Sequence, residues 1–261
     1  MRRPLASVER LLPKGWGDLL KQLALFVLAY QGYQLVRGIA DGKVALAMAN
    51  GERVIDLERS LGTFFEPGFQ QALLEHHWLI DTANFMYLNT QFVITTGFLV
   101  WLYLFRNEHF YFVRNMFLVA MGLALVGYVA FPTAPPRFFP DSGFTDTIAS
   151  VANVDQDTGA VGLLVNPYAA VPSVHIAFAL MVAVPGTFLS RNAAARLFWS
   201  GYPLLVFLVI VVTANHYWFD AAAGAAVACL AALTADRVLA RVGPEAWSWP
   251  PAGETVGEAT A

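Results

Sequence analysis

Six apolar runs, each about 20 residues long and so long enough to cross a bilayer as a helix, most constrain the fold of this 261-residue chain. They cover residues 19–39, 80–105, 111–131, 171–189, 197–213 and 217–239. Hydrophobic residues make up 57% of the chain and charged residues 13%, whereas charged residues are about a quarter of a typical soluble domain. We therefore predict an all-α, polytopic membrane protein with six transmembrane helices.

The predicted membrane domain covers residues 19–241 and leaves little chain for a soluble domain. Residues 1–18 are expected to form a cytoplasmic N-terminal segment, and residues 242–261 a disordered cytoplasmic tail. Between the first two runs, residues 41–79 mix charged and apolar side chains. This favours amphipathic helices at the membrane interface, divided at Pro67-Gly68. The connection at 132–170 is rich in Pro, Gly and Asp, and long loops of this kind are commonly functional.

The basic residues set the expected orientation. Those expected on one side precede the first run, flank alternate connections and follow the sixth run: Arg2, Arg3, Arg10, Lys14, Lys21, Arg106, Arg114, Arg191, Arg196, Arg237 and Arg241. The positive-inside rule then places both termini in the cytoplasm and the 132–170 connection on the extracytoplasmic side. A short chain with few cysteines fits a bacterial plasma membrane, with a luminal-facing organelle membrane as the alternative.

Composition also excludes several classes of function. The net charge of −3 provides no basic face for nucleic acid, and the single cysteine, Cys229, excludes a disulfide within the chain. Neither a zinc-type Cys/His spacing nor a glycine-rich phosphate loop is present. The acidic residues of the long connection lack the ligand order of a calcium loop. We therefore predict no metal and no organic cofactor.

Two short motifs at the edges of apolar runs carry the candidate chemistry. They are Pro172-Ser173-Val174-His175 and the segment from His216 to Asp220. Ionisable groups at membrane depth are costly and by default indicate a functional site. A carboxylate four residues after a histidine lies on the same helix face, so Asp220 can hold one imidazole nitrogen of His216 and leave the other as nucleophile or base.

The first motif predicts a helix N-terminus that binds an anion. Serine is a good helix cap, and Ser173 precedes unpaired backbone N–H groups that suit a phosphate. His175 beside that anion could protonate a leaving oxygen. Arg137 is the only cation in the 132–170 connection and could clamp phosphate oxygens. Together these residues indicate a phosphoryl-transfer site that needs no metal.

The two motifs resemble the second and third motifs of the type 2 phosphatidic acid phosphatase superfamily, and the resemblance covers residues 110–239. It implies a six-helix membrane core and an enzyme that cleaves or transfers lipid phosphates. It also implies His216 as a nucleophile that forms a phosphohistidine, Asp220 as its partner and His175 as general acid. Ser173 and Arg137 would bind the substrate.

The chain departs from the superfamily pattern at two of three cation positions. Ala130 stands where the first motif has a lysine seven residues before its arginine, and Ile210 stands where the third motif has an arginine. The run from Phe131 to Arg137, together with Thr213 to Asp220, is closer to the inositol phosphorylceramide synthase branch. That branch passes a phosphoryl-containing head group to inositol or another alcohol.

We therefore expect a lipid phosphatase or phosphotransferase at the extracytoplasmic face. The partners implied are a lipid phosphate or phospholipid and, for transfer, an alcohol acceptor such as inositol. The alternative from another class is a proton-coupled transporter in which His175, His216 and Asp220 relay protons. No inverted repeat supports it. A bis-histidine haem protein is a third hypothesis, but a serine-capped helix start has no purpose there.

Overall fold

The computed structural model describes residues 12–40, 43–148 and 168–242, with the side chains of residues 33–40 left out. The predicted tail at 243–261, the first 11 residues and the part of the long connection at 149–167 lie outside the described residues. The regular structure of the described part is helical, and its β-structure is limited to one isolated bridge between Thr133 and Ala169. This confirms the all-α prediction for these residues.

Within the described residues, four helices are long and apolar enough to cross a membrane, and each overlaps a predicted span. The first is continuous over His77–Phe105 and combines α5 (His77–Phe85), a π-helical turn η2 (Met86–Thr90) and α6 (Gln91–Phe105). The others are α7 (Asn107–Ala130), α10 (Ala193–Val212), and α11 (Trp218–Thr234) with its π-helical extension η5 (Ala235–Leu239). The chain therefore has the helices of a polytopic membrane protein.

The other two predicted spans are present as helices but do not meet the same criterion. α9 (Val174–Leu189) has 16 residues, fewer than the about 20 needed to cross the hydrocarbon layer upright. α2 (Gly15–Ala40) has 26 residues but is not among the helices that are apolar enough. The six-span arrangement stays a prediction.

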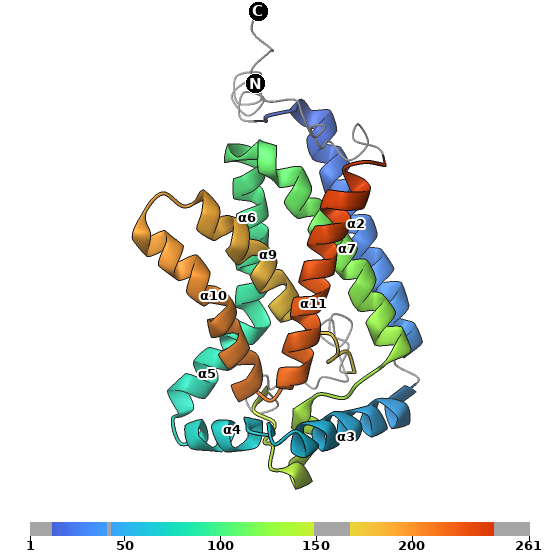
Figure 1. Ribbon diagram of the computed structural model, residues 1–261, viewed down its shortest axis with the longest axis vertical. Helices are drawn as coiled ribbons and strands as arrows, with labels where there is room; N and C mark the ends of the chain where they lie inside the picture. The colour runs from blue at the N-terminus through green and yellow to red at the C-terminus, as the bar shows by residue number, and fades with distance from the viewer. Residues whose placement is uncertain (1–11, 41–42, 149–167, 243–261) are drawn as a thin grey trace, which may run out of the picture.

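Helix α9 lies at the centre of the bundle, in contact with α6, α7, α10 and α11 (Figure 1). Its small buried residues, among them Ala177, Ala179 and Ala183, allow these neighbours to approach closely. Helix α2 packs along the outside of α7, on the side away from α10. The two motifs at the starts of α9 and α11 are thereby brought together, because these two helices are in direct contact.

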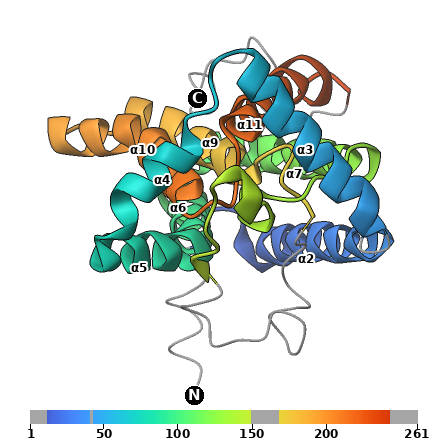
Figure 2. The ribbon, with the colours of Figure 1, turned by 90° about the horizontal axis from the view of Figure 1, so that it is seen from below.

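Helices α3 (Val44–Ser60) and α4 (Glu66–Leu74) lie across one end of the bundle, below the start of α11 (Figures 1 and 2). One face of α3 is buried, as expected for an amphipathic helix, and it packs on the chain around Ala134, Phe139 and Tyr217. The break between α3 and α4 lies at residues 61–65, not at Pro67-Gly68. Pro67 stands in the first turn of α4, where a missing N–H costs nothing. The place of these helices at a membrane interface stays a prediction.

One basic residue differs from its expected position. Arg114 does not flank a connection but is fully buried within α7, where Nη1 donates to Gln22 Oε1 and Nη2 to Asn115 Oδ1. Close by, Asp18 of α2 accepts hydrogen bonds from Tyr103 and Tyr111. This polar cluster fixes the position of α2 against the bundle. Polar side chains in an apolar interface keep their hydrogen bonds only when the two helices have one relative position.

Candidate active site

The site is built on the sharp turn that connects α10 to α11. Ala214 has a φ of +51°, a left-handed conformation that costs a non-glycine residue of order 1 kcal/mol and needs support from its surroundings. The support comes from outside the turn, because Arg137 N donates to Ala214 O and Gln70 Nε2 donates to Val212 O. This turn points His216 back toward the start of α9.

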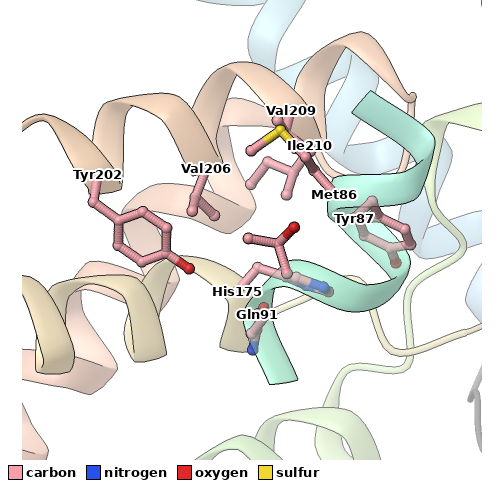
Figure 3. A pocket seen from close by; sticks show the side chains of 9 residues that line it. Met86, Tyr87, Gln91, His175, Tyr202, Val206, Val209 and Ile210 are labelled. Atoms are coloured by element: carbon pink, nitrogen blue, oxygen red, sulfur yellow. The ribbon is translucent and has the colours of Figure 1, made fainter. Parts of the chain in front are cut away.

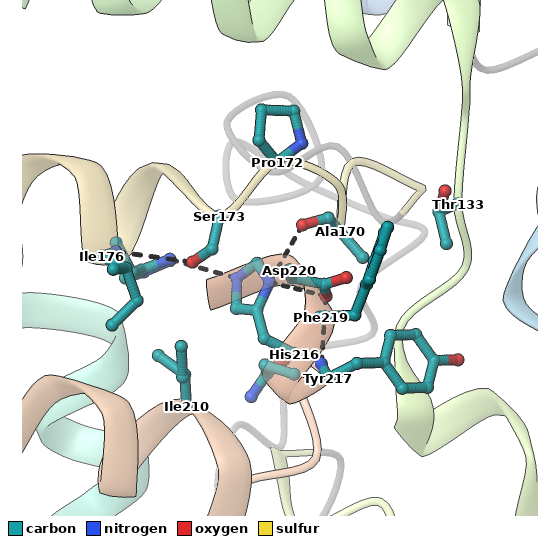
Figure 4. Close-up of polar contacts among 12 residues, drawn as sticks. Thr133, Ala170, Pro172, Ser173, Ile176, Ile210, His216, Tyr217, Phe219 and Asp220 are labelled. Atoms are coloured by element: carbon teal, nitrogen blue, oxygen red, sulfur yellow. Dashed lines mark hydrogen bonds and ion pairs between the residues drawn. The ribbon is translucent and has the colours of Figure 1, made fainter. Parts of the chain in front are cut away.

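The imidazole of His216 is held at one nitrogen and free for chemistry at the other. Nδ1 lies 3.0 Å from Ala170 O and 3.2 Å from Asp220 Oδ2, both of which accept hydrogen bonds (Figure 4). The proton therefore belongs on Nδ1, which leaves a lone pair on Nε2. Asp220 Oδ2 also accepts from Tyr217 N at 3.0 Å, so the carboxylate is fixed by the helix start that it caps.

His175 lies next to the lone pair on His216 Nε2. Its Nδ1 lies 3.3 Å from His216 Nε2, and its ring stacks on Tyr87 of the π-helical turn with centroids 4.6 Å apart. Ser173 is the N-cap of α9, with its Oγ accepting from Ile176 N. Ser173 N in turn donates to Asp220 O, which ties the two helix starts together through their backbones. The sequence-predicted residues His175, His216, Asp220 and Ser173 thus form one cluster.

Arg137 joins this cluster from the long connection. It is only 7% exposed, its Nη1 donates to Asn215 Oδ1, and its guanidinium lies close to the Tyr87 side chain. Its Nε is buried and has no hydrogen-bond partner among the described residues, the nearest carboxylate oxygen being Asp146 Oδ2 at 4.0 Å. The structure therefore places one buried cation beside the residue that precedes His216.

The electrostatic surroundings keep His216 neutral. Burial lowers the pKa of its imidazole to about 3, and the Arg137 guanidinium adds to the shift, although the carbonyl of Ala170 opposes it. A histidine with its pKa below the ambient pH has its lone pair available for attack. Attack by Nε2 would place a positive charge on the ring. Ala170 O and Asp220 Oδ2, which accept from Nδ1, are in position to stabilise that charge.

A small cavity adjoins His175, between α10 and the π-helical turn. Its wall contains His175, Tyr87 and Gln91 together with apolar side chains of α10, among them Val206 and Ile210 (Figure 3). Its lining is almost entirely apolar, which suits a hydrocarbon group or an ester rather than a second charged group. The π-helical turn that forms one wall is a type of distortion often found at functional sites.

Two buried carboxyl groups near the site were missed by sequence analysis. Glu58 Oε1 accepts from Phe219 N at 3.1 Å, and Glu66 Oε1 accepts from Trp218 N at 2.9 Å. Both side chains are fully buried. A signal existed for Glu58, because it follows the apolar Val54 by four residues and so lies on the buried face of its helix. Glu66 precedes Pro67 in the first turn of a helix, where exposed acidic residues are common, and no sequence pattern indicates that it is buried.

Gly224 sets how closely α11 can approach α9. A Cβ atom at this position would lie 2.2 Å from Ser173 O, a backbone atom that has no freedom to move aside. We expect Gly224→Ala to push the two helix starts apart, destabilise the fold by about 1–3 kcal/mol and reduce turnover. Gly201→Ala in α10 is the matched control, since its Cβ would meet nothing within 4 Å. Equal thermal unfolding temperatures for the two variants in detergent would contradict this prediction.

The sequence matches a known protein family. No curated protein and no solved structure matched the chain. A protein-family model described as the PAP2 superfamily matches residues 52–234, which is more than two thirds of the chain and runs from α3 to the end of α11. The matched range contains both histidines, Asp220 and Arg137. The chain therefore belongs to the PAP2 superfamily, a family of phosphatase-type membrane enzymes.

Proposed function

We propose that this protein is a metal-independent membrane phosphatase or phosphotransferase that acts on a lipid phosphate or phosphodiester through a phosphohistidine at His216. The observation that carries the proposal is the 3.3 Å contact between His216 Nε2 and His175 Nδ1, with His216 Nδ1 held by Asp220. One histidine in this pair has a lone pair to attack phosphorus, and the other has a proton to give. Membership of the PAP2 superfamily supports the phosphatase-type chemistry.

In the first step, the Nε2 lone pair of His216 attacks phosphorus and forms a P–N bond. The P–O bond to the lipid alcohol breaks, and His175, which enters the step as its imidazolium, transfers a proton to the leaving oxygen and becomes neutral. Asp220 and the Ala170 carbonyl stabilise the positive charge that develops on the His216 ring. In the second step, water or an acceptor alcohol attacks phosphorus, the P–N bond breaks and His175 takes up the proton.

The phosphate oxygens are expected at the start of α9 and not at that of α11. The first amides of any α-helix lack intrahelical acceptors and attract anions. At α11 the amides of Tyr217, Trp218 and Phe219 are already bound by carboxylates of Asp220, Glu66 and Glu58. At α9 the neutral Ser173 side chain caps only the amide of Ile176, which leaves that helix start able to receive a phosphate.

Substrate entry has to separate the two histidines. An in-line reaction puts phosphorus between them, with ~3 Å to the attacking nitrogen and a hydrogen bond to the leaving oxygen, so the nitrogens would stand roughly 6–7 Å apart. The present distance is 3.3 Å. The small cavity beside His175 marks the side to which that ring would move away from His216, and its apolar wall would face the leaving group (Figure 3).

The active site is proposed to face the extracytoplasmic side of a bacterial plasma membrane. The α6–α7 and α9–α10 connections lie away from α3 and α4, at the other end of the bundle (Figure 1). Basic residues cluster at those connections, with Arg106 before α7 and Arg191 and Arg196 around the start of α10. The positive-inside rule supports placing that end in the cytoplasm and the histidine pair outside.

The decisive experiment identifies the products of the purified protein. Lipid phosphates and phospholipids are offered in detergent with EDTA, with and without myo-inositol, while free phosphate and new lipids are measured by mass spectrometry. Phosphate release that ignores inositol supports a hydrolase, and an inositol-containing lipid phosphate ester supports head-group transfer. Absence of both products across the panel, or a requirement for added metal, contradicts the proposal.

Arg137 is proposed to bind phosphate oxygens, so removal of its charge should weaken the binding of phosphate. Loss of a charge-assisted hydrogen bond costs about 1.5–3 kcal/mol, so Arg137→Gln should raise the inhibition constant of inorganic phosphate roughly 10–100-fold. Asn215→Ala is the control, because it removes the partner of Arg137 without removing the cation. If the two variants weaken phosphate inhibition equally, Arg137 acts only by supporting the turn.

A further inference from the structure

The start of α11 is held by two carboxyl groups that reach it from two other helices. Glu58 of α3 binds the amide of Phe219, and Glu66 of α4 binds the amide of Trp218. Both glutamates are 0% exposed. These amides belong to the second and third residues after His216 and to the helical turn that contains Asp220. The two glutamates therefore hold the segment of backbone from which the proposed nucleophile and its partner project.

The pair is short of hydrogen-bond donors. In each glutamate Oε1 accepts a hydrogen bond from an amide, while Oε2 is buried and has no hydrogen-bond partner in the described part of the chain. The two carboxyl groups are close enough to interact with each other. Two ionised carboxylates in such a place would repel each other without a compensating cation. A single proton between them removes the repulsion and satisfies both orphaned oxygens, as in other carboxyl pairs that share one site.

We propose that Glu58 and Glu66 form a proton-sharing carboxyl pair that positions His216 and Asp220 by gripping the first two amides of α11. The proposal deepens the phosphohistidine mechanism and rests on it. Neither glutamate touches substrate in this arrangement. They are positioning residues whose effect reaches the reaction through the backbone of Trp218 and Phe219.

The surroundings of Glu58 agree with a retained proton. Burial raises the pKa of Glu58 to about 9 from its ordinary 4.5, and repulsion from Glu66 and Asp220 adds to the shift, although the amide of Phe219 opposes it. The titratable groups that face the pair are Asp220 and Tyr217, and neither is a cation. Since the folded pKa is raised, the stabilisation is complete below about pH 4.5 and is lost as the pH rises through about 9.

The proposal predicts opposite results for two replacements of Glu58. Glu58→Gln keeps an acceptor for Phe219 N and a permanent donor toward Glu66, so it should rescue the activity that Glu58→Ala loses and abolish the loss of activity near pH 9. Glu58→Ala should lower kcat roughly 10–100-fold with little change in KM, because the displaced nucleophile costs rate rather than binding. Glu52→Ala, an exposed glutamate of the same helix, should resemble the wild type.

An infrared measurement tests the shared proton without relying on turnover or on variants that fold poorly. Wild-type protein at neutral pH should show the carbonyl stretching band of a protonated carboxyl group that disappears near pH 9 and is missing in Glu58→Gln. Absence of that band, or an alkaline activity profile that Glu58→Gln leaves unchanged, overturns the proposal. The band does not depend on catalysis, so its presence in a protein without His216-dependent turnover would contradict the proposed function and not the pair.

Discussion

Replacing His216 with alanine should abolish turnover of lipid phosphates, with a loss on the order of 10⁴–10⁶-fold in kcat. The proposed mechanism has no other group in position to attack, because His175 Nδ1 faces His216 and its ring is stacked on Tyr87. The effect should appear in kcat rather than in KM, since the start of α9 and Arg137, and not His216, are the proposed phosphate-binding groups. Turnover by the purified variant measures it directly.

A fold control and a covalent trap make this prediction sharper. His109→Ala removes an exposed histidine at the other end of the bundle and should leave turnover unchanged. Wild-type protein quenched during turnover of a phosphate-labelled substrate should carry label that survives alkali and is lost in acid, as expected for a phosphoramidate. Label on the His216→Ala variant, or full activity without it, would show that another residue is the nucleophile.

The residues of the proposed catalytic cluster could be named from the sequence because each half of the cluster is local in the chain. His216 and Asp220 are four residues apart at a helix start, and Ser173 and His175 are two apart at another. The sequence spacing could not show whether the starts of α9 and α11 lie in contact. They meet because Gly224 lets α11 approach Ser173 O and because Ser173 N donates to Asp220 O. A spacing pattern predicts each half of such a site but not the contact between the halves.

Other parts of the site depend on contacts that no local pattern encodes. Ala170 contributes only a backbone carbonyl to His216, and any residue type could supply that atom. Asn215 gains its role from Arg137, which is 78 residues away in the chain. Glu58 and Glu66 were assigned to charged interfacial helices, since acidic residues are mostly exposed. Their burial follows from the position of α3 and α4 across the start of α11.

Two features of this chain affect the charge around the proposed phosphate site: the two absent superfamily cations and the buried Glu58 and Glu66. Where the superfamily pattern has further cations, this chain has Ala130 and Ile210, and Ile210 is fully buried in the apolar core. In the proposed mechanism, one arginine and the start of α9 then balance the phosphate charge. The proton proposed for the Glu58–Glu66 pair would limit the negative charge near that phosphate. Fewer cations and a protonated pair are thus compatible with the same anion.

Replacing His175 with asparagine should slow the reaction in a way that depends on the leaving group. An alkyl alcohol leaves poorly unless its oxygen is protonated, so kcat/KM for a lipid phosphate should fall roughly 10²–10⁴-fold. The phenolate of an aryl phosphate such as p-nitrophenyl phosphate leaves without a proton, so its kcat/KM should fall far less. The value of kcat/KM depends only on the steps up to formation of the phosphohistidine, so a slower second step does not affect it.

The dependence on leaving group separates general acid catalysis from a merely structural role. Asparagine is short enough to occupy the space between His216 and Tyr87, but it has no proton to transfer at neutral pH. If His175 only supported the His216 ring, both substrates would lose rate equally, because attack on either uses the same nitrogen. An equal loss therefore assigns His175 to support, whereas a selective loss for the alkyl ester makes it the proton donor. The 3.3 Å contact then becomes the resting form of a pair whose members stand on opposite sides of phosphorus during the reaction.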